Sequence, residues 1–179
     1  MTPKPDRLWA PWRYEYIKST VGADIECFLC EALSANEDKD RLILFRGTQA
    51  FVILNKYPYS NGHLLIVPNR HVNTLNELDE NEHNVLFGLV RVTTLWLDHS
   101  YNPQGYNIGL NLGKAAGAGL PGHLHVHVVP RWEGDTNSMP VLAGVKVISE
   151  SLNVTYSKLK ESIKLFLINL SHVLFLINI

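Results

Sequence analysis

The stretch that decides the fold is HLHVHVVPR, residues 123–131. Its three histidines, His123, His125 and His127, alternate with hydrophobic residues. Successive side chains of a β-strand point to opposite faces, so this alternation predicts three imidazoles on one face and apolar side chains on the other. The apolar face indicates a buried core, and the histidine face therefore indicates a cleft.

The residues alone leave three interpretations of this histidine row open. It is a chance pattern on a half-exposed strand, or three ligands of one metal ion, or a covalent catalyst that attacks phosphorus with its middle imidazole. Histidine is scarce, which disfavours chance. Three adjacent imidazoles are costly to protonate together, so some must stay neutral at pH 7, and a neutral imidazole is a nucleophile and a proton shuttle.

Working outward from that stretch, the hydrophobic pattern predicts an α+β domain. The longest helical pattern begins near Leu75 and ends at Tyr101, with Asp79 as N-cap and Glu82 at capping-box spacing. Further helices are expected from Cys27 to about Ala35 and from Tyr156 to about Leu170. Apolar runs predict strands over 41–46, 50–54, 63–67, 105–111 and 122–129. We expect an antiparallel sheet of about five strands with one long helix packed on it, in a dimer.

Length and composition indicate one folded domain of ordinary size. The chain has 179 residues, of which 46% are hydrophobic, and 16 basic against 17 acidic side chains give a net charge of −1. This balance disfavours a basic nucleic-acid footprint and a polybasic membrane patch. We expect a domain over 1–150, with an aromatic N-terminal extension, and a helical, apolar tail over 151–179 that is too interrupted to span a membrane.

The start of the chain and its cysteines predict a cytoplasmic protein. The first residues carry no apolar stretch of signal-peptide length. Cys27 and Cys30 are the only cysteines, and one such close pair is not a secreted disulfide framework. By itself the pair is a redox couple, two reduced thiols or half of a metal site that needs two more ligands. His71 and His123 are the available candidates.

The histidine row resembles the signature of the histidine triad (HIT) superfamily, in which each of three histidines precedes a hydrophobic residue. Asn55, Gly62–His63 and the run PNRH at 68–71 stand where that family has them. This resemblance covers residues 24–132.

The flanking segments are similar to one branch of the family. Residues 1–20 and 132–148 resemble bacterial proteins described as diadenosine tetraphosphate phosphorylases. The resemblance implies cleavage of dinucleoside polyphosphates, with His125 as the nucleophile that forms a nucleotidyl-histidine. His127 and His63 would bind phosphate oxygens and assist the leaving group. Many family members carry Gln beside Ser or Thr where this chain has GLPG at 119–122, so the acceptor, phosphate or water, stays open.

The resemblance also implies nucleotide-binding residues and a metal. Backbone N–H groups of the glycine-rich loop, which holds Gly117 and Gly119, would contact phosphates. Asn55 and Asn111 would hold ribose hydroxyls or a phosphate. Zinc-bearing relatives use a Cys-Cys-His-His set that includes the first histidine of the triad, which implies a structural Zn²⁺. The ligands implied here are Cys27, Cys30, His71 and His123.

Other functions and assemblies stay open beside this one. The chain could hydrolyse nucleoside phosphoramidates or adenylyl conjugates, or serve as a nucleotide-binding scaffold with weak catalysis. It could also hydrolyse its substrate on a single metal ion held by the three histidines of the row. We expect a homodimer that uses the long helix and the tryptophan-rich N-terminus, and no nucleic-acid or membrane partner.

Overall fold

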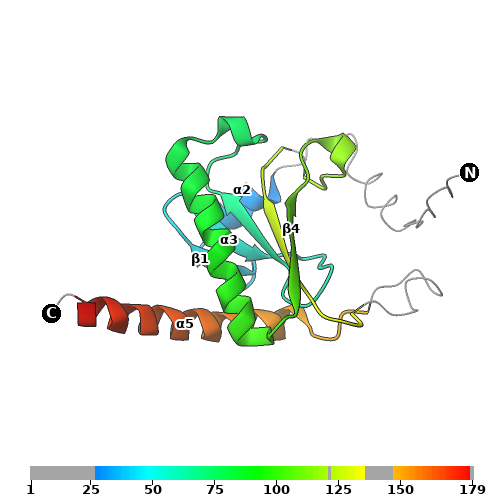
Figure 1. Cartoon of the computed structure of the whole chain (residues 1–179). Coiled ribbons are helices and arrows are strands. Elements are labelled where there is room, and N and C mark those ends of the chain that lie inside the picture. Colours follow the sequence, from blue (N-terminus) through cyan, green and yellow to red (C-terminus); the bar gives the residue numbers. More distant parts are fainter. Residues whose placement is uncertain (1–26, 121, 136–146, 178–179) are drawn as a thin grey trace, which may run out of the picture.

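The computed structural model describes residues 27–120, 122–135 and 147–177, and its core is one five-stranded antiparallel sheet in the order β1-β2-β3-β5-β4 (Figure 1). This arrangement confirms the predicted α+β class. The elements in chain order are α2 (Phe28–Ser34), β1 (Ile43–Arg46), β2 (Ala50–Leu54), β3 (Leu64–Pro68), the 3-10 turn η1 (Leu75–Glu77), α3 (Glu80–Tyr101), β4 (Gly105–Leu110), η2 (Lys114–Ala116), β5 (Val126–Arg131) and α5 (Leu152–Ile177).

Two apolar clusters lie on opposite faces of the sheet. Strands β2 and β3 are buried along their whole length, so their alternate side chains enter different clusters. On one face, Val52 and Ile66 pack with residues of α3 and α5. On the other face, Phe51 and Leu65 pack with residues of α2. The short helix α2 covers only part of its face, and the histidines lie on that same side.

The long helix α3 begins where its capping box places it. Asp79 accepts a hydrogen bond from the backbone N–H of Glu82, and the Glu82 carboxylate accepts one from the backbone N–H of Asp79. The predicted helix from Leu75 is therefore wrong in its first turn, which is the separate 3-10 turn η1. The extended backbone of Asp79 interrupts the helical run, and the α-helix starts at Glu80.

A second long helix, α5, is 26 residues long and exceeds the 22 residues of α3. Tyr156, Leu159 and Ile163 from its first half enter the same cluster as α3. Its last turns run past the edge of the sheet (Figure 1). Within the described part of the chain, no helix combines the length and the hydropathy that a membrane span requires.

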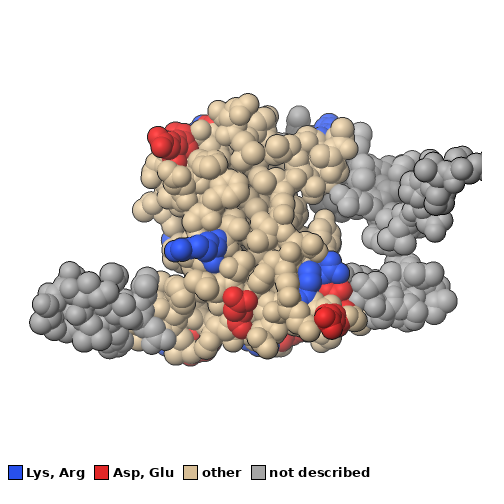
Figure 2. Space-filling view, in the orientation of Figure 1, with Lys and Arg blue, Asp and Glu red and all other residues tan. Residues whose placement is uncertain are grey.

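The aromatic N-terminal extension and residues 136–146 of the flanking segment 132–148 lie outside the described residues. Figure 2 shows the face of the molecule on which α3 lies, where most of the described surface carries neither basic nor acidic side chains. Phe87 and Leu95 of α3 are 38% and 43% exposed. This helix therefore presents apolar side chains to its surroundings.

Candidate active site and metal-ligand group

The histidine row begins before the strand that was predicted to hold it. Strand β5 starts at Val126, so His123 and His125 precede it and the prediction of a strand from Gly122 is wrong there. The segment leaves the sheet because the backbone N–H of Leu124 donates to the carbonyl of Val72, in the loop after β3, at 2.6 Å. The alternation still holds, since Leu124 and Val126 are buried in the core cluster.

The structure brings the three predicted catalytic residues, His63, His125 and His127, together, so that their rings are neighbours. The ring centroids of His125 and His127 lie 4.9 Å apart, and those of His127 and His63 lie 5.2 Å apart. His63 directly precedes β3, whose Leu65 pairs with His127 of β5. The antiparallel pairing of β3 and β5 therefore places His63 beside His127, although the two are 64 positions apart in the sequence.

His125 has one ring nitrogen anchored and the other available. Its Nδ1 lies 2.8 Å from the carbonyl oxygen of His123. A carbonyl only accepts, so Nδ1 carries the proton and Nε2 carries a lone pair. Burial lowers the pKa of His125, and the ring is therefore neutral at pH 7. At 8% exposure, only an edge of the residue reaches the surface.

A chain of hydrogen bonds decides which nitrogens of His63 and His127 carry protons. The backbone N–H of Tyr59 donates to Nδ1 of His63 at 3.0 Å, so the proton of His63 is on Nε2. That Nε2 lies 3.0 Å from Nδ1 of His127 and donates to it. His127 therefore carries its own proton on Nε2 and is a hydrogen-bond donor there.

Asn55 makes a further contact with this series of hydrogen bonds. Its side-chain oxygen accepts a hydrogen bond from the backbone N–H of Tyr57 at 2.9 Å, which turns the amide nitrogen toward Nδ1 of His63 at 3.3 Å. The sequence reasoning missed Tyr59, whose ring lies 4.6 Å from that of His63 and stacks at 5.9 Å on that of His127. Its place four residues before His63, in a turn rich in Asn, Pro and Gly, was the available signal.

Strand β4 leaves open space beside the row. Gly109 pairs with His127, and a Cβ added to Gly109 would meet no heavy atom within 4 Å. Asn111 follows Leu110, the partner of Val126, and so lies at the level of His125. Glycine in a strand often marks a place where a ligand approaches the backbone.

The predicted phosphate loop is the connection between β4 and β5. Gly117 and Gly119 are half-buried in it, and Gly117 has a φ of 80°, a left-handed conformation that favours glycine. A groove of about 680 Å³ lies elsewhere on the described surface, between β1 and α5. No residue of the histidine row lines that groove, so chemistry rather than depth identifies the candidate active site.

The four predicted metal ligands converge beside the row. The ligand atoms of Cys27, Cys30, His71 and His123 all lie within 4.8 Å of one another. Cys27 Sγ and Cys30 Sγ are 3.2 Å and 3.4 Å from Nδ1 of His123, and Cys30 Sγ is 3.2 Å from Nδ1 of His71. Ligands at about 2.0–2.3 Å from a tetrahedral zinc ion are themselves about 3.3–3.8 Å apart, so this group fits zinc.

Hydrogen bonding and burial prepare His123 as a metal ligand, whereas Cys30 has a proton to lose. Nε2 of His123 donates to the carbonyl of Pro68 at 3.0 Å, which leaves Nδ1 as the ligand atom. Burial lowers the pKa of His123 and keeps its ring neutral. Burial and the neighbouring Cys27 raise the pKa of Cys30 to about 11, so a bound cation would have to displace that thiol proton.

The same contacts argue against one ion held by the three histidines of the row. Nδ1 of His123 faces the sulfurs, Nδ1 of His125 bonds to a carbonyl, and Nδ1 of His127 bonds to His63. The three rings are therefore oriented toward different partners. Over residues 27–120, 122–135 and 147–177, only the Cys–His group brings three or more metal-type ligands this close.

Comparisons with known proteins identify the family. The model of the HIT domain matches residues 36–134, which is more than half of the chain. The chain therefore belongs to the HIT domain family.

Two relatives of known name are similar to the chain over different lengths. The AP-4-A phosphorylase of Mycobacterium tuberculosis (strain CDC 1551 / Oshkosh) is 39% identical over 155 residues, which cover 83% of this chain and 80% of that protein. The asymmetrical bis(5'-nucleosyl)-tetraphosphatase of Schizosaccharomyces pombe is 32% identical over 93 residues, which cover 52% of this chain and 50% of that protein.

Solved structures share the fold. A hypothetical histidine triad nucleotide-binding protein from Sulfolobus tokodaii is 27% identical, with a TM-score of 0.60 over 77% of this chain and 92% of that one. A zinc-bound histidine triad family protein from Mycobacterium smegmatis is 22% identical, with a TM-score of 0.64 over 79% of this chain and 95% of that one. At that identity, the second likeness concerns the fold alone.

Proposed function

We propose that this chain cleaves dinucleoside polyphosphates by moving a nucleotidyl group to Nε2 of His125 and then to phosphate or water. The observation that carries the proposal is the anchoring of His125 Nδ1 on the His123 carbonyl, which presents the lone pair of Nε2 in a neutral ring. The name of the Mycobacterium tuberculosis relative supports this substrate class over phosphoramidates and adenylyl conjugates.

The first step forms a bond between Nε2 of His125 and the α-phosphorus. The bond from that phosphorus to the bridging oxygen breaks, and the oxygen leaves with its electron pair. The Nε2–H of His127 stabilises this oxygen by a hydrogen bond, and His63 holds the His127 ring in the required orientation. The adduct is an imidazolium whose remaining proton stays on Nδ1, facing the His123 carbonyl.

The second step transfers the nucleotidyl group to its acceptor. An oxygen of phosphate or water attacks the same phosphorus, the P–N bond breaks, and its electron pair returns to Nε2 of His125. Phosphate as acceptor yields a nucleoside diphosphate, whereas water yields a nucleoside monophosphate and one proton released to solvent. Two displacements replace one difficult attack of an anion on a polyphosphate.

The Cys27–Cys30–His71–His123 group is proposed to hold one structural zinc ion. Bound zinc would fix the His123 ring and, with it, the carbonyl on which His125 is anchored. The roles of Asn55, Asn111, Gly117 and Gly119 in nucleotide binding stay predictions of the same site.

The test incubates the protein with diadenosine tetraphosphate, with and without inorganic phosphate. We expect ADP and ATP when phosphate is the acceptor, and AMP and ATP when water is. Intact-mass measurement at short times should detect an acid-labile nucleotide adduct that maps to His125. His125→Asn is the control for adduct formation, and wild-type protein that forms neither adduct nor products would remove the proposal.

The homodimer, the division into 1–150 and 151–179 and the cytoplasmic location stay predictions. The exposed Phe87 and Leu95 support α3 as part of a dimer interface. The first half of the 151–179 segment packs on the sheet, because its Tyr156, Leu159 and Ile163 belong to the apolar cluster shared with α3.

A further inference from the structure

The short helix α2 bears half of the proposed metal group. Cys27 is its N-cap residue, and Cys30 lies in its first turn. The helix has seven residues, the side chain of its N-cap residue makes no capping hydrogen bond to the helix backbone, and its last turn has no basic residue. A helix this short is marginal by itself, so contacts from outside must hold it in place.

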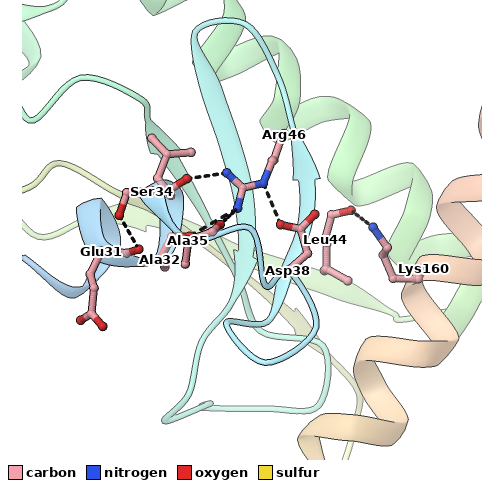
Figure 3. A network of polar contacts seen from close by, with 9 residues as sticks. Glu31, Ala32, Ser34, Ala35, Asp38, Leu44, Arg46 and Lys160 are labelled. Carbon is pink, nitrogen blue, oxygen red and sulfur yellow. Dashed lines mark hydrogen bonds and ion pairs between the residues drawn. The ribbon is translucent and has the colours of Figure 1, made fainter.

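Arg46, from the end of β1, supplies those contacts (Figure 3). Its guanidinium donates from Nη1 to the carbonyl of Leu33 at 2.6 Å, and from Nη2 to the carbonyls of Ala35 at 2.6 Å and Ala32 at 3.4 Å. Asp38 holds the guanidinium by accepting from Nε at 2.7 Å.

These contacts serve the end of the helix where carbonyls lack partners. The last carbonyls of a helix have no intrahelical donor and carry partial negative charge. In α2 the backbone N–H of Ala35 occupies the Glu31 carbonyl, while Arg46 takes the carbonyls of Ala32, Leu33 and Ala35. One planar cation from the sheet therefore replaces the cap that the helix itself lacks.

We propose that Arg46 is a positioning residue for metal binding. By capping α2 from β1, it holds Cys27 and Cys30 at the distance from His71 and His123 that a tetrahedral ion requires. Beside that cap, the buried Leu29 and Ala32 attach the helix to the sheet. Apolar contacts let a short helix slide or rotate, whereas a fork of directional hydrogen bonds does not. The inference rests on the metal site of the proposed function.

The test compares metal affinity in Arg46→Met, Arg46→Lys and a matched control, Arg41→Gln. Arg41 forms an ion pair with Glu31 of the same helix at 2.7 Å, but the two side chains are 37% and 50% exposed. Such a surface pair contributes little, so the control loses a positive charge near α2 without losing the cap. The full-length protein is stripped of metal and titrated with Co²⁺, whose absorption reports tetrahedral thiolate coordination, and zinc affinity is measured by competition with a chelator.

We expect Arg46→Met to weaken zinc binding by about 10- to 100-fold, the range seen when residues that orient ligands are removed. Arg46→Lys keeps the charge without the fork and should fall between Arg46→Met and wild type, while Arg41→Gln should stay within about twofold of wild type. In the metal-free Arg46→Met variant, hydrogen exchange should be faster than in metal-free wild type at the amides of α2 and unchanged in β2 and β3.

The outcomes separate this inference from the site on which it rests. Wild-type affinity in Arg46→Met overturns the inference, and if that variant fails to fold, wild-type affinity in Arg46→Lys overturns it equally. An equal loss of affinity in Arg41→Gln also overturns it, because charge rather than capping would then be responsible. If wild-type protein and a Cys27→Ser variant give the same Co²⁺ spectrum without thiolate bands, the metal site itself fails.

Discussion

His123 and His125 lie two residues apart, both are buried, and yet the structure prepares them for different chemistry. His123 donates from Nε2 to the Pro68 carbonyl and turns Nδ1 toward two sulfurs. His125 donates from Nδ1 to the His123 carbonyl and keeps the lone pair of Nε2. The residue type is the same, so the carbonyl that each ring meets determines whether it is suited to ligate a metal or to attack phosphorus.

The largest expected effect comes from the nucleophile side of this comparison. His125→Asn should reduce kcat by at least about a thousandfold, because no other side chain of the row presents an unprotonated Nε2. Its zinc content should equal that of wild type, which elemental analysis checks. A variant with full activity, or with lost zinc, would contradict the division of roles.

The ligand side of the comparison should respond first in its zinc affinity. His123→Ala should lose zinc affinity by about a hundredfold or more, because a tetrahedral site keeps only three of its ligands. The midpoint temperature of thermal unfolding should fall. kcat should also fall, because the backbone at His125 is displaced. His123→Cys, which restores a ligand atom, is the matched control. Zinc retention in His123→Ala equal to that of wild type would argue against the site.

A smaller effect is expected at His63, which acts through His127. His63→Leu should lower kcat by about tenfold, because His127 loses the donor that orients its ring. KM should change less than kcat. Substrates with a leaving group of low pKa should be less affected, and equal losses for all leaving groups would show that His63 supports only the fold.

The last expected effect concerns stability, at the start of α3. Hydrogen bonds from Arg70 and from the Asp79 backbone lower the pKa of the buried Glu82 to about 2, and the guanidinium of Arg70 also bonds to the Glu77 carbonyl. Because the pKa is lowered on folding, this stabilisation is complete above pH 4.5 and is lost as the pH falls toward 2.

Glu82→Gln should therefore lower the free energy of unfolding at pH 7 by about 1–2 kcal/mol, through the weakened cap and ion pair. The difference from wild type should shrink on going from pH 5 to pH 2, as urea unfolding at several pH values would measure. Asp79→Asn is the matched control, since it keeps a capping side chain. A difference that does not depend on pH would contradict the assignment.

Local sequence patterns were sufficient to predict most of the secondary structure. The capping box of Asp79 and Glu82 is a contact between neighbours, so it could be predicted before the fold was known. The alternation predicted that Leu124 and Val126 are buried, and this was correct even where the strand assignment was not. The second long helix was predicted too short at both ends, from Tyr156 to about Leu170, because polar residues such as Asn169 and Ser171 interrupt its apolar end.

For the site, the sequence could predict which residues take part but not how they are arranged. The triad pattern and its resemblance indicated His63, His125 and His127, and the Cys-x-x-Cys pair with His71 and His123 indicated a metal group. Arg46 was missed because its side chain bonds to backbone carbonyls of another element, such as that of Leu33. Tyr59 was missed because its role includes its own backbone N–H, which donates to the His63 ring across a turn.

The sequence by itself determined the α+β class, because hydrophobic periodicity and capping depend on neighbours within a few residues. The HIT family was indicated separately, by the resemblance of the histidine motif. The tertiary structure alone decided which nitrogen of each histidine carries a proton and which sulfur meets which ring. Cys27 and His123 are 96 positions apart, and only the folded sheet, with α2 held on one face, brings them to 3.2 Å. Hydrogen-bond direction and tetrahedral geometry depend on distances that no local pattern encodes.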